Sequence, residues 1–414
     1  MANSQVPSIS PLGGSEFPFK GQIHAPGTEE YIISRQKNYA YNSKYQDEMY
    51  PAYFAYPENG EFESILSAIS FGKKTGLHIM GRSGGHQYAG VSSDSGSIII
   101  DMQEWTTIGN VLESENVVGL KLALKYPKLV TVGVGVTLGD LAKRLSDEHC
   151  TIPMGECPSV CVGGHMQTGG WGHLARSNGL FTEYVRGFTI ITAEGIKRVS
   201  CKSTVCELDL YKAVRGGSPG AFGIITDVTI LPLCDDVFPN ARSYGQIVPI
   251  VGDTGYESIS EVMGFFFETM NKIGNSSEAL GINLNYSHIA RVVSPSIISK
   301  AFGCLVPIMS RKVEVLLVEV TIIDDTDVSS MALFQECINR TEEVKRRTKY
   351  GCLDKLMNMT MMILSSKTLK DGRRRMPLSV INESFVRETP FVTEKTCTNP
   401  QQRVNEFPFQ GQAL

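Results

Sequence analysis

The chain has 414 residues, of which 42% are hydrophobic and 20% are charged. This balance is ordinary for a globular protein, and the length predicts two or three domains with a large buried core. Lys and Arg number 39 against 43 Asp and Glu, so the net charge of −4 lacks the basic excess of a nucleic-acid binder. We therefore expect no nucleic-acid partner. No apolar stretch reaches the roughly 18 residues that span a bilayer, so we also expect no membrane segment.

The first half of the chain predicts strands that alternate with helices and glycine-rich loops. Residues 1–46 lack a sustained period and predict an irregular arm that packs on the core. From residue 47 onward, short apolar runs and helical spacing follow one another, which indicates strand and helix packed in layers. The expected elements are a strand at 53–56, a helix at 61–75, strands at 77–80, 97–102 and 128–134, a helix at 138–149, a hairpin of 185–192 and 196–201, and a strand at 224–231.

After Pro232 the pattern changes and predicts a separate α+β lobe with an antiparallel sheet. Its expected elements are a helix at 257–272, strands at 280–286 and 312–323, and a helix at 331–349. The segment EFPFKGQ at 16–22 recurs as EFPFQGQ at 406–412, which suggests that a second repeat begins in the tail. The expected division is therefore an arm at 1–46, a first lobe at 47–235, a second lobe at 236–395 and a tail at 396–414.

Glycine is over-represented: 40 of the 414 residues are glycine, about 10%, against a usual share of about 7%. The glycines cluster in three loops. The first loop, GRSGGHQYAG at 81–90, directly follows an expected strand, and consecutive amides in such a turn form a nest for an anion. The second lies within 155–187, where no helical or strand period is visible, and the third is RGGSPGAFG at 215–223. Loops of this kind indicate close approach of the backbone to a flat or phosphorylated ligand.

Two other motifs suggest a nicotinamide cofactor or a zinc ion. Gly133, Gly135 and Gly139 nearly match the dinucleotide fingerprint and favour a nicotinamide-type Rossmann turn, but the acidic residue expected about 20 positions later is missing. The alternative is a tight strand-to-helix turn. Cys161, His165 and His173 suggest a zinc site, but their spacing matches no compact structural site, so we expect no metal.

The glycine loops carry a family resemblance. The block RSGGHQYAGVSSDSGSIIID at 82–101 resembles the flavin-binding loop of the berberine-bridge-enzyme-like FAD-linked oxidases, within the vanillyl-alcohol-oxidase superfamily with its PCMH-type FAD-binding domain. GECPSVCVGGHMQTGGWGHLARSNGL at 155–180 and AVRGGSPGAFGIITDVTI at 213–230 resemble later blocks of that family, in the same order. GVGVTLGDL at 133–141 falls where the family has its own strand and helix, so the resemblance also accounts for the Rossmann-like motif.

The resemblance implies bound FAD, attached covalently through His86 to the 8α-methyl and through Cys157 to C6 of the flavin. A thiolate is the reactive form of cysteine, and the alternative for Cys157 is an ordinary buried thiol with Cys161 beside it. The residue matching Val160 lies near flavin C4a in the family, where a small side chain favours access of oxygen. The implied cofactor-binding set is Arg82, Ser83, Gly84, Gly85, His86, Gln87, Gly90, Ser92, Cys157, Val160, Val162, Gly163, Gly164, His165, Gly169, Gly170, Gly172, Leu174, Gly223, Ile224 and Ile225.

The resemblance further implies an α+β fold with two lobes: a PCMH-type FAD-binding domain at 47–235 and an α+β substrate lobe with an antiparallel sheet at 236–395. The implied reaction moves a hydride from an alcohol carbon, sugar-like or small, or from an amine carbon to the flavin, with O2 as acceptor and H2O2 as product. The partners are then a small-molecule substrate and O2. The catalytic base is open among His165, Tyr184 and Tyr286. Trp171 and Tyr184 pack either around the flavin ring or in the core.

Two departures from the family keep an alternative open. The third loop has Ser218-Pro219-Gly220-Ala221 where the family mostly has Gly-Gly-Gly-Asn. The family's closing C-terminal segment with its Asn-Tyr motif is not found, so the alternative is a non-catalytic or truncated FAD-binding pseudoenzyme. A nicotinamide dehydrogenase is the third possibility. The compartment stays open.

Overall fold

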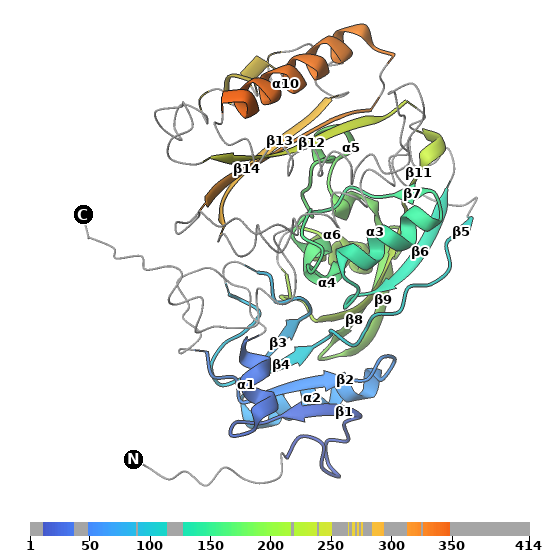
Figure 1. Ribbon diagram of the computed structural model, residues 1–414. Coiled ribbons are helices and arrows are strands. Elements are labelled where there is room, and N and C mark those ends of the chain that lie inside the picture. Colours follow the sequence, from blue (N-terminus) through green and yellow to red (C-terminus); the bar gives the residue numbers. More distant parts are fainter. Residues whose placement is uncertain are drawn as a thin grey trace.

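The computed structural model shows two lobes joined side by side (Figure 1). A four-stranded sheet lies at one end, a five-stranded sheet in the middle, and a three-stranded sheet covered by a long helix at the other end. The structure describes residues 11–36, 49–87, 90–113, 127–216, 219–237, 240–250, 264, 267–269, 271–272, 275, 284–293, 313–323 and 326–347.

The four-stranded sheet has the order β1-β2-β4-β3. Strands β2 (Tyr53–Pro57), β4 (Ser97–Asp101) and β3 (His78–Arg82) are parallel, and helix α2 (Phe62–Thr75) connects β2 to β3. All five residues of β4 are buried, because a parallel strand in mid-sheet is covered on both faces, and its centre is the apolar run Ile98–Ile100. The strands and the helix expected here are confirmed to within two residues.

The expected irregular arm is wrong in part. Strand β1 (Gly21–His24) pairs antiparallel with β2, and helix α1 (Glu29–Gln36) follows it. Gly21 lies so close to β2 that a Cβ there would come within 2.0 Å of the Tyr56 carbonyl oxygen. A strand whose partner lies more than 30 residues away has no local signal, which is why periodicity missed it. The arm does pack on the core, through the buried Leu12.

The five-stranded sheet is antiparallel throughout, in the order β5-β6-β10-β8-β9. Its strands are β5 (Leu112–Glu113), β6 (Lys128–Gly133), β10 (Ile224–Ile230), β8 (Val185–Thr192) and β9 (Gly195–Ser200). The hairpin and the apolar strands predicted here are confirmed. The Rossmann interpretation is wrong, because β6 is antiparallel to both neighbours whereas a dinucleotide turn needs a parallel strand–helix–strand unit.

Five helical segments and a small two-stranded ladder accompany this sheet in the chain. Helix α3 (Leu138–Asp147) begins at Thr137, whose side chain accepts a hydrogen bond from the Asp140 amide, and helix α6 (Val205–Val214) precedes the third glycine loop. Strands β7 (Cys150–Thr151) and β11 (Leu233–Cys234) pair with each other. The region 155–187, expected to lack regular structure, contains α4 (Val162–Gln167), α5 (Ala175–Asn178) and the 3₁₀ turn η2 (Phe181–Tyr184). Elements of one or two turns are too short to show a period.

The second lobe is an antiparallel sheet of order β12-β14-β13, as expected. The 3₁₀ turn η3 (Asp235–Val237) leads toward β12 (Arg242–Ile250), and helix α10 (Val328–Arg347) packs on β12 and β14. Strand β14 (Val313–Ile322) matches the expectation, and β13 (Leu284–Val293) confirms the expected strand over its described residues 284–286 and continues to Val293. Within the expected helix at 257–272, the described residues 264, 267–269 and 271–272 are helical.

The basic run at 372–375, the repeated segment at 406–412 and the tail at 396–414 lie outside the described residues. Among the helices that the structure describes, none has the length and apolar content required to cross a bilayer.

Candidate functional site

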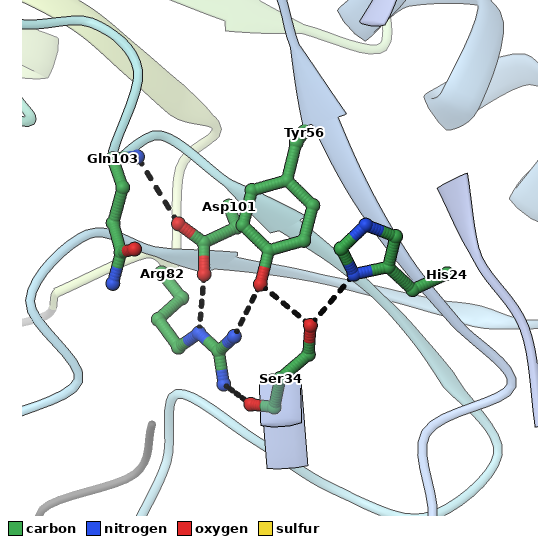
Figure 2. A network of polar contacts seen from close by, with 6 residues as sticks. All are labelled: His24, Ser34, Tyr56, Arg82, Asp101 and Gln103. Carbon is green, nitrogen blue, oxygen red and sulfur yellow. Dashed lines mark hydrogen bonds and ion pairs between the residues drawn. The ribbon is translucent and has the colours of Figure 1, made fainter. Parts of the chain in front are cut away.

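A buried ion pair fixes the strand end from which the first glycine loop starts. Arg82 and Asp101 are register partners at the carboxyl ends of the parallel strands β3 and β4, with Arg82 Nε donating to Asp101 Oδ2 over 2.7 Å. Both side chains are fully buried. The guanidinium also donates to the Ser34 carbonyl oxygen and to the Tyr56 hydroxyl, at 3.0 and 3.3 Å (Figure 2).

The network continues outward to the N-terminal segment. Tyr56 donates to the Ser34 hydroxyl over 2.9 Å, and His24 Nδ1 lies 2.8 Å from the same oxygen (Figure 2). Asp101 Oδ1 accepts the backbone amide of Gln103. The Arg82 side chain, expected among the cofactor contacts, therefore makes its hydrogen bonds within the protein, beneath the loop, and acts on that loop by holding the end of β3.

The first glycine loop packs tightly on the second. A Cβ on Gly84 would come within 3.0 Å of the Cys161 amide nitrogen and 3.1 Å of the Ser159 carbonyl oxygen, so a side chain there would push the two loops apart. Gly85 and Gly90 have φ of 68°, in the left-handed region that residues with a side chain rarely adopt. Together these three glycines bring the residues between them, including His86, against the second loop.

The third loop meets both others. Gln167, at the end of α4, accepts the Gly220 amide through Oε1 at 3.0 Å. Gly81, at the end of β3, is so near β10 that a Cβ there would come within 3.0 Å of Ile224 Cδ1. Gly223 has φ of 148° and turns the chain into β10, where Ile224 and Ile225 are buried. The structure thus brings the three glycine loops of the sequence together in one region.

At the contact between the first two loops, the two residues expected to attach the flavin converge on one hydroxyl. Ser159 Oγ lies 3.0 Å from His86 Nε2 and 3.5 Å from Cys157 Sγ. Burial lowers the pKa of His86 to about 4, so its imidazole is neutral at neutral pH. Sequence reasoning did not assign Ser159 a role; its place between Cys157 and Val160 in the matching block was the available signal.

The two neighbouring cysteines differ in environment. Cys157 is half-buried, whereas Cys161 is only 6% exposed, at the start of α4. Burial raises the pKa of Cys161 to about 12, so its thiol stays protonated at neutral pH. Burial thus disfavours the reactive thiolate at Cys161, and Cys157 is the more accessible of the two thiols.

The second loop combines close approaches with open backbone. A Cβ on Gly172 would lie 1.8 Å from the Met154 carbonyl oxygen, and Gly169 and Gly170 are left-handed, with φ of 91° and 74°. Gly163 is covered by Val134, whereas Gly164 has no neighbour within 4 Å of its Cβ position. The remaining loop residues of the expected set divide between buried positions, at Val162 and Leu174, and the half-buried Val160.

Two of the three candidate bases are held by other interactions. His165 Nε2 accepts the Gly155 amide at 3.1 Å, and burial lowers the pKa of His165 to about 4. Tyr184 is 1% exposed and donates to the Asn178 carbonyl oxygen at 2.6 Å, and burial raises its pKa. Neither geometry favours proton abstraction from a substrate.

The third candidate base, Tyr286, lies on β13 opposite Val320. Strand β13 is packed against α5, so the second lobe meets the glycine-rich region there. Of the two aromatic residues expected near the flavin or in the core, Tyr184 is in the core and Trp171 is 61% exposed.

The residues present fit a flat cofactor that carries phosphates. The hydroxyl oxygen of Ser92 is buried and has no partner within the described part of the chain, which suits a hydrogen bond to a ligand. The left-handed Gly85 and Gly90 flank the nest-type turn, and the open side of Gly164 leaves room for a ring. Gln87 lies between these glycines in the same loop, and Ser83 lies against Gly163 of the second loop.

Comparison with known proteins agrees with this geometry. Residues 51–200 match the family model described as FAD binding domain. FAD-linked oxidoreductase pynB of Aspergillus niger is 32% identical over 206 residues, which are 50% of this chain and 34% of the relative. Berberine bridge enzyme-like 5 of Arabidopsis thaliana is 29% identical over 214 residues, 51% of this chain and 38% of the relative. The chain thus spans less than half the length of these relatives.

Solved structures show the same fold. Physcomitrella patens BBE-like 1 superposes with a TM-score of 0.54 at 24% identity, over 77% of this chain and 58% of that one. A glucooligosaccharide oxidase of Acremonium strictum superposes with a TM-score of 0.53 at 19% identity, over 77% of this chain and 55% of that one. The two-lobed α+β arrangement is therefore similar to that of these two proteins.

Proposed function

Because residues 51–200 are an FAD binding domain and the chain's homologues are berberine-bridge-like and FAD-linked oxidoreductases, we propose that this protein is an FAD-dependent oxidase of a small molecule. Bound FAD supplies the redox chemistry, accepting a hydride from an alcohol or amine carbon and delivering the electrons to O2 as H2O2. The observation that carries the proposal is the convergence of His86 and Cys157 on Ser159 where the glycine loops meet.

The chain's own residues hold the cofactor in this proposal. The first glycine loop and Ser92 bind its phosphates, and the backbone around Gly164 and Gly223 approaches the ring. When FAD is bound, His86 and Cys157 would each hold it by one covalent bond. Each bond would replace a flavin C–H and a protein N–H or S–H, with the two electrons and two protons passing to O2 as H2O2.

The neutral state of His86 supports attachment there, because an imidazole attacks carbon through an unprotonated nitrogen. Ser159 positions both side chains, since its hydroxyl lies within contact of the imidazole and the thiol at once. The half-buried Cys157 retains access to a bound ring, whereas the protonated Cys161 does not compete. Val160, between them in the sequence, stays small at the position the family uses near oxygen access.

For the substrate, we propose a sugar-like or small alcohol first and an amine second. Two structurally similar proteins are named as sugar oxidases, a glucose oxidase variant of Phl p 4 and the glucooligosaccharide oxidase of Acremonium strictum. Trp171 offers an exposed aromatic face in the glycine-rich loop, and aromatic faces pack well on sugar rings. Tyr286 on β13 is the proposed base, because His165 and Tyr184 already use their reactive atoms elsewhere.

The test is reduction of the flavin by donors under nitrogen. Protein loaded with FAD is mixed with glucose, an oligosaccharide, a benzylic alcohol or a benzylic amine, and loss of flavin absorbance is followed before air is admitted and peroxide is measured. We expect at least one donor to bleach the flavin and to yield peroxide. Tyr286→Phe should lower kcat by about 10²-fold or more, while Tyr50→Phe, at an exposed site, should leave it unchanged.

One observation favours a second function. Because two of the three candidate bases are unsuited to proton abstraction, a non-catalytic FAD-binding protein is the alternative. That protein binds FAD and turns yellow, yet no donor bleaches it. If a donor bleaches the flavin equally fast in wild type and in Tyr286→Phe, Tyr286 is not the base, but the protein is still an oxidase.

A further inference from the structure

Outside the flavin site, two buried cysteines face each other across a short ladder. Cys150 of β7 and Cys234 of β11 are directly opposed register partners, 84 positions apart in the chain, with their sulfur atoms 3.9 Å apart. Cys150 is fully buried and Cys234 is 5% exposed. No step of the proposed oxidase uses either thiol.

The ladder geometry suits a bond between them. The Asp235 amide donates to the His149 carbonyl oxygen at 2.9 Å, which marks those two residues as a hydrogen-bonded pair. Pairs alternate along an antiparallel ladder, so Cys150 and Cys234 form the non-hydrogen-bonded pair, whose Cα atoms approach to about 4.5 Å. Disulfides span Cα separations from about 4.4 to 6.8 Å, so rotation of the side chains suffices to join the sulfur atoms.

The backbone before Cys150 is set for this arrangement. His149 has φ of 55°, in the left-handed region, and it is the one residue other than glycine found there in the described part of the chain. Such a residue is strained by about 1–3 kcal/mol and persists where its surroundings require it. Here it turns the chain sharply from α3 into β7, which places Cys150 opposite Cys234.

A cation makes the two thiols unequal. Lys128 of β6 donates through Nζ to the Glu148 carbonyl oxygen at 3.3 Å, and its charge acts on both sulfur atoms. The contact with Cys150 and the charge of Lys128 lower the pKa of Cys234. The contact with Cys234 and burial raise the pKa of Cys150, whose thiol donates to the Glu148 carbonyl oxygen at 3.3 Å. Because the Cys150 thiol keeps its hydrogen on the Glu148 carbonyl oxygen and Cys234 is the more exposed of the two, Cys234 is suited to attack and Cys150 to resolve.

We propose that Cys150 and Cys234 are a peroxide-responsive dithiol whose closure to a disulfide clamps the end of the FAD-binding lobe. The Cys234 thiolate attacks one oxygen of H2O2, giving a sulfenic acid and hydroxide. The Cys150 sulfur then attacks the Cys234 sulfur and releases water, so two thiols and one H2O2 become one disulfide and two waters. A small dithiol reverses the step.

The position of the bond gives it a consequence. Strand β7 leads within seven residues to Cys157, and β11 is the last strand of the first lobe before η3 and β12. A disulfide here would link the segment that precedes the flavin loop to the segment that leads into the second lobe. Closing a loop of this length should raise the Tm by about 5–10 °C.

The test uses the full chain, first fully reduced and freed of reductant, and then treated with H2O2. Wild type should give a cross-linked peptide containing Cys150 and Cys234, a mass lower by two hydrogens and a higher Tm, all reversed by dithiothreitol. Cys150→Ser should stop at a sulfenic acid on Cys234 that dimedone traps, and Cys234→Ser should give neither product. Cys206→Ser, at an exposed cysteine, should behave like wild type.

Lys128→Gln tests whether the lysine charge activates the thiol, beyond the closeness of the two sulfur atoms. This substitution should slow disulfide formation several-fold without preventing it. Absence of the cross-link at peroxide concentrations that oxidise Cys206 would overturn the proposal, as would trapping on Cys150 in place of Cys234. A cross-link that leaves the Tm unchanged would overturn the clamp. The reaction needs no flavin and no substrate, so failure of the oxidase assay and failure here are distinguishable.

Discussion

Replacing Asp101 by Asn tests the role of the buried ion pair under the first glycine loop. The substitution keeps the shape of the side chain and one acceptor for the Gln103 amide, but it removes the charge opposite Arg82. It also turns a donor or a weaker acceptor toward a guanidinium that is fully buried. Breaking a buried ion pair from one side costs about 3–5 kcal/mol, because the remaining charge is left without compensation.

The assay is urea unfolding of the protein, followed by fluorescence, together with retention of FAD on a desalting column. We expect Asp101→Asn to lower the free energy of unfolding by about 3–5 kcal/mol and to weaken FAD binding, since Arg82 directly precedes the loop. Adding Arg82→Met should recover at least about 2 kcal/mol, because the unpaired charge disappears. Ser34 and Tyr56 then lose only hydrogen bonds from the guanidinium.

The matched control is the exposed pair between Lys197 and Glu194 at the tip of the β8–β9 hairpin. Glu194→Gln should change the free energy of unfolding by no more than about 0.5 kcal/mol. A loss below about 1 kcal/mol for Asp101→Asn, or a double variant weaker than the single one, would refute the reasoning. Either result would mean that the network of Figure 2 does not hold the strand end.

Three further outcomes follow from the site. Burial lowers the pKa of His165 to about 4 and of His173 to about 3, below the ordinary 6.5, so the unfolded chain binds more protons between those values. Stability should be full above about pH 6.5 and fall as the pH drops toward 4, and His173→Gln should flatten that fall in urea midpoints; a flat wild-type profile would contradict it. Gly172→Ala should destabilise the fold by about 3 kcal/mol or more, because its Cβ would meet the Met154 carbonyl, while Gly164→Ala should retain wild-type stability; equal thermal midpoints would contradict this contrast. Ser159→Ala should slow flavin attachment several-fold in a time course of bound flavin, and an unchanged rate would show that the hydroxyl does not position His86.

The elements with strong apolar patterns were predictable from sequence. Strand β4 has three consecutive buried isoleucines at its centre, and α3 has one apolar face, so both stand out locally. The glycine loops were also visible, since tight packing and left-handed φ demand a residue that sequence displays directly. The antiparallel second lobe followed from the change of pattern after Pro232.

Non-local contacts were not predictable. Strand β1 is defined by a partner far along the chain, and α5 is a single turn without a period. The candidate bases show the same limit: Tyr184 looked available, yet the fold buries it against a backbone carbonyl. Ser159 was invisible as a bridge because its two partners come from different loops.

The most direct test of the account is the mass of the intact protein after acid denaturation, for wild type and for His86→Ala, Cys157→Ala, both together, and Cys161→Ala as control. The account predicts that wild type, the control and each single variant at an attachment residue carry the mass of one FAD, and that only the double variant releases it. Wild type that loses its flavin in acid, or a double variant that keeps it, would contradict attachment at His86 and Cys157.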